Sequence, residues 1–233
     1  MTTTTVAFAL YPGCTLLDFA GATQIFAYTA GFKVVWLATK PDAIATTEGV
    51  SVMPNATFKD VPFADIVFVP GGGGEGVSTA MFEEGIQGWL KQAGPHAQWA
   101  GSVCTGAFVA AAAGLFDGCK VTTYWSMRDA LALFPAVELV PGYPRWQIDC
   151  DQRRFSGGGI SSSLDLALEL VKQIAGEGAA QATQLANQYA PDPPVQSGDP
   201  TEASPELVIT TTQGQADMNA QLTAAVKALT GQH

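Results

Sequence analysis

The feature that most restricts the fold is a series of short, uninterrupted apolar runs separated by segments with helical character. The runs span residues 6–10, 33–38, 65–69 and 98–103, and the helical segments are 18–30, 82–93 and 106–113. Strands without polar alternation are buried on both faces, which is typical of a parallel sheet with helices on each side. The sequence therefore predicts an α/β fold in which helices sandwich a parallel sheet.

The second half of the chain predicts shorter elements and a separate C-terminal segment. A short edge strand is expected at residues 50–53, further strands at 137–140, 146–149 and 153–155, and helices at 160–175 and 177–188. Residues 191–205 have the Pro-, Gly- and Ser-rich composition of a linker. We expect one α/β domain over residues 1–194. An extension over 195–233, amphipathic from 206 to 229, is expected to pack on that domain or on a partner subunit.

Charge and hydrophobicity exclude several classes of function. The net charge is −10 and the pI about 4.4, so a phosphate backbone or an anionic membrane would be repelled. No uninterrupted apolar run is long enough to span a bilayer. Only 14% of the residues are charged, which is consistent with surface hidden in an oligomer contact. The first residues lack the basic region of a signal peptide, so we expect a cytoplasmic protein.

The four cysteines stand too far apart in the sequence for a zinc motif or a disulfide framework. We therefore expect no metal and no cofactor, and we expect the thiols to be reduced. Of the two histidines, His96 precedes a predicted strand and His233 is the last residue. Neither position is expected to bring an imidazole to a catalytic thiol.

The strongest candidate for a catalytic residue is Cys104, in the sequence Gly-Ser-Val-Cys-Thr-Gly-Ala of residues 101–107. A buried strand ends there and a helix rich in small residues begins at once. This pattern is typical of a nucleophile elbow, in which the side chain is presented on a strained turn. The helix N-terminus would favour the thiolate. The alternative is a buried structural cysteine.

A run of glycines follows the apolar run at 65–69, in the sequence Pro-Gly-Gly-Gly-Gly-Glu-Gly of residues 70–76. Its spacing formally matches a dinucleotide fingerprint, but the next strand carries no acidic residue at its end to bind a ribose. We favour a loop whose backbone N–H groups, at Gly71 and Gly72, face a substrate or an oxyanion. The other alternative is a flexible turn.

Asp18 stands among apolar residues just after the first strand. In a parallel sheet this places it at the same edge as Cys104. One interpretation is a helix N-cap, which Asp commonly provides. The other is an acid in an apolar pocket, whose raised pKa would let it transfer protons near neutral pH.

Together these segments resemble the DJ-1/PfpI superfamily and, within it, the isocyanide hydratases. The matching stretches spread over roughly residues 6–194. They are FALYPGCTLLDFAG, VPGGGGEG, SVCTGAFVAAAAGLFDGCKVTTYW, SGGGISSSLDLAL and QYAPDPP.

The resemblance implies a flavodoxin-like fold, also that of class I glutamine amidotransferases, a homodimer, and a reactive cysteine that needs no cofactor. It also implies addition of water to a small-molecule isocyanide, giving an N-substituted formamide. Cys104 would be the nucleophile, Asp18 the acid–base residue and Thr105 a supporting residue. Many relatives read TTHW where this chain has Tyr124 in TTYW.

The expected reaction proceeds through a thioimidate on Cys104, with Asp18 transferring protons and backbone N–H groups of Gly72 and Thr105 near the reacting centre. Two alternatives use the same cysteine. One is a glyoxalase- or deglycase-like enzyme acting on α-oxoaldehydes, which the missing histidine disfavours. The other is a redox sensor or ligand-binding protein without turnover.

Overall fold

The computed structural model describes residues 3–232 and contains a seven-stranded sheet in the order β10-β11-β7-β6-β1-β2-β5. Every neighbouring pair is parallel except β10 and β11, which form an antiparallel hairpin at one edge. The strands are β1 (Thr4–Ala9), β2 (Phe32–Ala38), β5 (Ala56–Thr57), β6 (Ile66–Val69), β7 (Trp99–Val103), β10 (Trp146–Asp149) and β11 (Arg154–Gly157).

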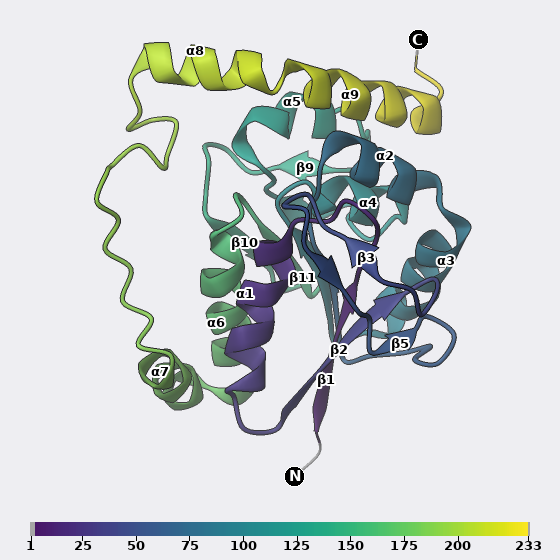
Figure 1. Ribbon diagram of the computed structural model, residues 1–233, viewed down its shortest axis with the longest axis vertical. Coiled ribbons are helices and arrows are strands. Elements are labelled where there is room, and N and C mark those ends of the chain that lie inside the picture. Colours follow the sequence, from purple (N-terminus) through teal and green to yellow (C-terminus); the bar gives the residue numbers. More distant parts are fainter. Residues whose placement is uncertain (1–2, 233) are drawn as a thin grey trace.

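Helices cover both sides of this sheet (Figure 1). On one side α1 packs on α6, and α6 packs on α7; on the other, α2 contacts α3 and α4. The bounds are α1 (Leu16–Ala27), α2 (Gly74–Phe82), α3 (Glu84–Ala93), α4 (Gly106–Ala112), α6 (Ser162–Ala175) and α7 (Glu177–Ala186). The predicted flavodoxin-like α/β fold is confirmed.

The central strands are apolar throughout because both of their faces are covered. All residues of β6 and β7 are buried, and Phe68 of β6 packs against Phe8 of β1 and Phe155 of β11. Burial of each such side chain stabilises the fold by about 1.5–3 kcal/mol. The strand order reverses between β1 and β6, and ligands of open α/β sheets bind at the carboxyl ends of the strands around such a point.

One local expectation is wrong, and two of the expected strands form outside the main sheet. The glycine run is not one open loop, since α2 begins inside it at Gly74. The edge strand expected at 50–53 is β4 (Ser51–Val52), which pairs with β3 (Ile44–Ala45) in a separate ribbon. The strand expected at 137–140 is β9 (Glu138–Leu139), which pairs with β8 (Lys120–Val121), also outside the main sheet.

The remaining elements are short. They are η1 (Gly94–His96), η2 (Trp125–Met127) and α5 (Arg128–Leu131). Within residues 3–232, no helix combines the length and hydrophobicity that crossing a bilayer requires.

The C-terminal segment forms two helices where the sequence predicts one amphipathic stretch. These are α8 (Pro205–Gly214), which Ser204 caps by accepting a hydrogen bond from Leu207 N, and α9 (Ala216–Thr230). α9 buries Leu222, Ala225 and Val226 and contacts α2, α4 and α5. Residues 190–204 run along the outside of the molecule and lead to these helices, which lie across the top of the view (Figure 1).

Candidate active site

The candidate residues converge at the carboxyl ends of three neighbouring strands. Asp18 follows β1, Gly71 follows β6 and Cys104 follows β7, and these strands are adjacent in the sheet. Parallel strands that end at one edge bring together residues distant in sequence. The site therefore lies on both sides of the strand-order reversal.

Cys104 occupies the strained turn between β7 and α4 that the sequence predicts. Its φ of 57° is in the left-handed region, which is costly for a residue with a side chain. The surroundings hold this conformation, because Cys104 N donates to Gly157 O at 3.0 Å and Thr123 Oγ1 donates to Cys104 O at 2.8 Å. Gly106 is required next to it, since a Cβ there would lie 2.5 Å from Val69 O.

Asp18 lies in the first turn of α1 with its side chain fully buried. Its Oδ2 accepts a hydrogen bond from Gly71 N at 2.7 Å. Its Oδ1 is buried and has no hydrogen-bond partner among the described residues. The N-cap of α1 is Thr15, so the interpretation of Asp18 as a helix cap is wrong.

The environment of Asp18 favours the protonated acid. The pKa of its carboxyl is raised to about 8, mainly by burial; the hydrogen bond from Gly71 N opposes the rise, and the charge of Glu48 adds a smaller part to it. Glu48 itself accepts a hydrogen bond from Leu16 N at 3.0 Å, at the start of the same helix. This agrees with the second interpretation of Asp18, a proton-transferring acid near neutral pH.

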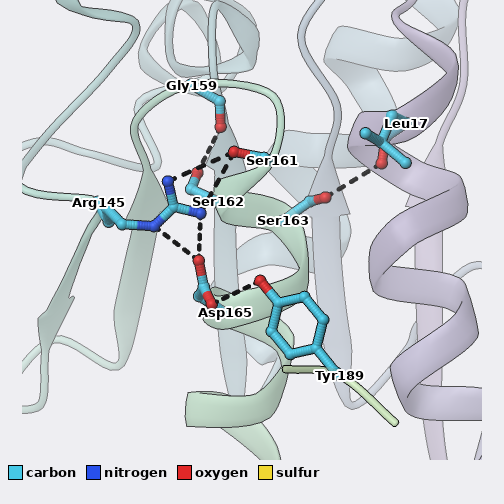
Figure 2. Close-up of polar contacts among 8 residues, drawn as sticks. All are labelled: Leu17, Arg145, Gly159, Ser161, Ser162, Ser163, Asp165 and Tyr189. Carbon is cyan, nitrogen blue, oxygen red and sulfur yellow. Dashed lines mark hydrogen bonds and ion pairs between the residues drawn. The ribbon is translucent and has the colours of Figure 1, made fainter. Parts of the chain in front are cut away.

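Asp18 and Cys104 approach each other across Gly71. A Cβ at position 71 would lie 2.7 Å from Asp18 Oδ2 and 2.8 Å from both Cys104 Cβ and Thr105 N. No real side chain tolerates such contacts, so only glycine fits between the acid and the cysteine. The first turn of α1 is also held from outside, because Ser163 Oγ donates to Leu17 O at 3.1 Å (Figure 2).

The Thr105 hydroxyl forms two hydrogen bonds with the glycine run. Its hydroxyl accepts from Gly72 N and donates to Gly72 O, both at 2.9 Å. With Gly71 N bonded to Asp18, both amides that the sequence assigns to a substrate or oxyanion are occupied by protein acceptors. In this structure Gly71 and Gly72 therefore hold the acid and the hydroxyl in place, and their contact with substrate stays a prediction.

The ionisation of Cys104 differs from the sequence prediction of a thiolate. The residue is only 6% exposed, and burial raises the pKa of its thiol well above the usual range. The neighbouring Asp18 adds to this rise, while the N–H and hydroxyl of Thr105 counteract part of it. α4 has only seven residues, and its dipole does not outweigh the desolvation. Burial thus favours a neutral thiol beside a neutral acid.

No histidine of the described chain serves the thiol. His96 lies at the amino end of β7 in η1, where its ring packs edge-on against Phe63 at 5.3 Å. This confirms the expectation for His96, whereas His233 lies outside the described residues. At the position where many relatives have histidine, the Tyr124 hydroxyl accepts a hydrogen bond from Gln215 Nε2 at 2.6 Å.

Two buried neighbours of the site were not identified from the sequence. Tyr11 donates its hydroxyl proton to Pro70 O at 2.8 Å, and Cys14 forms an isolated β-bridge with Gly72. Burial raises the pKa of both side chains. Their position just after β1, like that of Asp18, was the sequence signal that could have identified them.

Among residues 3–232 no three His, Cys, Asp or Glu side chains gather closely enough to hold a metal ion.

The fold and this turn define a class, the α/β sandwich proteins that present a cysteine on a strand-to-helix elbow. The model of the DJ-1/PfpI family matches residues 4–173. The chain belongs to the DJ-1/PfpI family.

Relatives within this family differ in kind. The chain is 34% identical over 206 residues to an isonitrile hydratase from Pseudomonas putida, covering 88% of this chain and 86% of the relative. It is 25% identical over 194 residues to the HTH-type transcriptional regulator CdhR from Pseudomonas aeruginosa, covering 78% of this chain and 53% of the regulator.

Solved structures share the fold. A THiJ/PfpI family protein from Pseudomonas syringae superposes with a TM-score of 0.90 at 30% identity, over 97% of this chain and 91% of the other. DJ-1beta from Drosophila melanogaster superposes with a TM-score of 0.73 at 21% identity, over 82% of this chain and all of the other.

Proposed function

We propose that this protein is an isocyanide hydratase that converts R–N≡C and water into an N-substituted formamide. Its similarity to the isonitrile hydratase over most of both chains supports this activity. The observation that carries the proposal is a buried acid with an unpartnered oxygen, Oδ1 of Asp18, next to a neutral thiol. An isocyanide carbon needs both a proton and a nucleophile, and this pair supplies both without a net charge.

In the first step Asp18 donates its proton to the terminal carbon while the sulfur of Cys104 bonds to the same carbon. The thiol proton passes to the carboxylate of Asp18. The product is a thioimidate, R–N=CH–S, in which the C–H and C–S bonds are new and Asp18 is again protonated.

Water then adds to the thioimidate carbon. Asp18 protonates the nitrogen and receives a proton from the water, which gives R–NH–CH(OH)–S with the sulfur still attached. Cleavage of the C–S bond, with transfer of the hydroxyl proton through Asp18 to sulfur, releases the formamide and restores the thiol. Asp18 begins every step protonated, so a carboxyl with a raised pKa suits the role.

The site does not favour the alternatives. A redox sensor uses an exposed, low-pKa thiol, whereas the Cys104 thiol is nearly covered and its pKa is raised. A glyoxalase-like reaction would lack the histidine that many relatives have, because Tyr124 stands there and bonds to Gln215.

Isotopic labelling tests the proposal. With an isocyanide in H₂¹⁸O, the formamide is expected to carry ¹⁸O, and in D₂O the formyl position is expected to carry deuterium, both read by mass spectrometry. Methylglyoxal serves as the competing substrate. Turnover of methylglyoxal without formamide production would contradict the proposal.

We further propose that the protein is a cytoplasmic homodimer. The low fraction of charged residues supports this state, as do large apolar side chains that are exposed in the single chain, such as Tyr28 at 58% and Leu185 at 81%. Light scattering after gel filtration is expected to give twice the mass of the chain, and a monomer at micromolar concentration would contradict it.

A further inference from the structure

A cavity of about 630 Å³ lies next to the candidate site. Three of its lining residues belong to the segments that hold Asp18 and Cys104. Leu17 directly precedes Asp18, Thr123 donates to the carbonyl of Cys104, and Gly158 follows the residue that accepts from Cys104 N. The cavity thus shares its walls with the backbone segments that hold the two residues, although neither Cys104 nor Asp18 itself lines it.

The two walls of the cavity come from different parts of the chain. The inner wall is made mainly of aromatic and aliphatic side chains, among them Tyr124, Trp125, Tyr143 and Ile160. The outer wall is made of residues between 196 and 202, which belong to the irregular segment that connects α7 to α8. We call residues 190–214 the strap; it comprises this segment and α8.

The lower end of the strap is anchored by a polar cluster (Figure 2). Tyr189 donates its hydroxyl proton to Asp165 Oδ1 at 2.8 Å. Arg145 Nε donates to Asp165 Oδ2 at 2.7 Å, and the guanidinium forms an ion pair with the same carboxylate and also reaches Ser161 Oγ. Because Arg145 also lines the cavity, this cluster joins the start of the strap to the cavity wall.

The upper end is anchored at the aromatic wall itself. Gln215 Nε2 donates to the Tyr124 hydroxyl at 2.6 Å, and Ser126 Oγ donates to Gln215 Oε1. Asn219 Nδ2 adds a bond to Ser126 O at 3.3 Å. One residue, Gln215, thus fixes both the end of the strap and the ring of Tyr124 that faces the cavity.

We propose that the strap is a specificity-determining wall that binds the nitrogen substituent of the isocyanide and selects a large aromatic one. The inference rests on the proposed hydratase activity. The aromatic and aliphatic side chains of the inner wall can pack on a bicyclic ring, while Gln196, Asp199 and Glu202 make the outer wall polar. A methyl group leaves most of the volume unfilled. Gln215 is a positioning residue, since it acts through Tyr124.

The first test places a large side chain on the outer wall. Gly198 lines the cavity, and a Cβ at this position meets no atom within 4 Å, so Gly198→Phe can be accommodated. We expect kcat/KM for 2-naphthyl isocyanide to fall at least tenfold, mainly through KM, while kcat/KM for methyl isocyanide changes less than twofold. The matched control is Gly88→Phe, at an exposed position on α3, which also has open space at Cβ and is not a cavity residue.

The second test removes the upper anchor. Gln215→Ala and Tyr124→Phe each remove the same hydrogen bond, and we expect both to lower the ratio of naphthyl to methyl kcat/KM about three- to tenfold. Gln213→Ala, at an exposed position on α8, is the control and should leave the ratio unchanged. Melting temperatures of the variants show whether each one folds.

The two proposals fail differently. Equal losses for both substrates in the folded Gly198→Phe variant, or a wild-type preference for methyl isocyanide, would overturn the strap proposal and leave the hydratase intact. No turnover of either isocyanide by the wild type would overturn the hydratase proposal and the strap proposal with it.

Discussion

Two buried cysteines, Cys14 after β1 and Cys104 after β7, allow an instructive comparison. Both lie close to Asp18, whose charge raises the pKa of both thiols, and burial is the main cause of the shift in each. Cys14 has an ordinary backbone conformation and bridges to Gly72, whereas Cys104 has a φ of 57° and the N–H and hydroxyl of Thr105 beside its sulfur. The two cysteines therefore share burial and a neighbouring acid, and the strained turn and the adjacent donors are what set Cys104, the proposed nucleophile, apart.

Removing each sulfur in turn tests this difference between the two cysteines most directly. Cys104→Ala is expected to lower formamide production by about 10⁴-fold or more, because no covalent intermediate can form. Cys14→Ala removes an equally buried thiol and is expected to keep kcat within about threefold. A progress curve with cyclohexyl isocyanide measures both. Comparable losses in the two variants would contradict the distinction.

Asp18, which influences both thiols, gives the next largest effect. Asp18→Asn keeps the size of the side chain and can still meet Gly71 N through its carbonyl, but it cannot relay protons. We expect kcat to fall about 10²–10⁴-fold, the usual contribution of a general acid or base. Circular dichroism and the melting temperature serve as controls for folding. A variant that keeps a tenth of wild-type kcat would exclude Asp18 as the proton relay.

The same carboxyl predicts the pH dependence. Since its pKa is raised to about 8 and every step begins with the protonated acid, kcat should be level below pH 7 and fall about tenfold per unit above pH 8. The folded protein should also lose stability as the pH rises toward 8, because the unfolded carboxyl ionises near pH 4 while the buried one does not. Steady-state rates and melting temperatures across pH 5–9 measure both. Activity that rises from pH 7 to 9 would contradict the assignment.

Removal of the Thr105 hydroxyl, which lies beside Cys104 only, should have a smaller effect. Thr105→Val removes both hydrogen bonds to Gly72 and leaves Gly72 N unpaired, so kcat should fall about tenfold and the free energy of unfolding by about 1–3 kcal/mol. Thr105→Ser keeps the hydroxyl and should restore most of both. Urea denaturation and initial rates provide the comparison, and a Val variant as active as the Ser variant would remove Thr105 from the proposal.

The fold was largely predictable because the apolar runs of β1, β6 and β7 are short but continuous and are bounded by turn residues. Strands were expected at β4 and β9, but their partners β3 and β8 were missed because each is two residues long and leaves no periodic pattern. The helix start at Gly74 was missed because glycine is a poor helix former, and tertiary packing overrides its propensity there.

The convergence of the candidate residues was predictable from the sequence, whereas the ionisation of the thiol was not. Cys104, Asp18 and Gly71 follow three strands, and strand order alone brings them together. The ionisation of the thiol depends on how completely it is covered, which the sequence of one short helix does not reveal. Likewise, Gln215 stands about ninety residues from Tyr124, and nothing in either segment indicates that the two side chains meet.

The left-handed backbone at position 104 has an evolutionary consequence. Replacement by glycine would relieve a conformational penalty of about 1–2 kcal/mol, so an inert descendant could fold more readily than its active ancestor. In lineages where turnover ceased to matter, drift would thus run toward loss of the sulfur while the sandwich persisted. Under the proposed function, the cysteine at this turn is kept at a cost in stability because its sulfur is needed for the reaction.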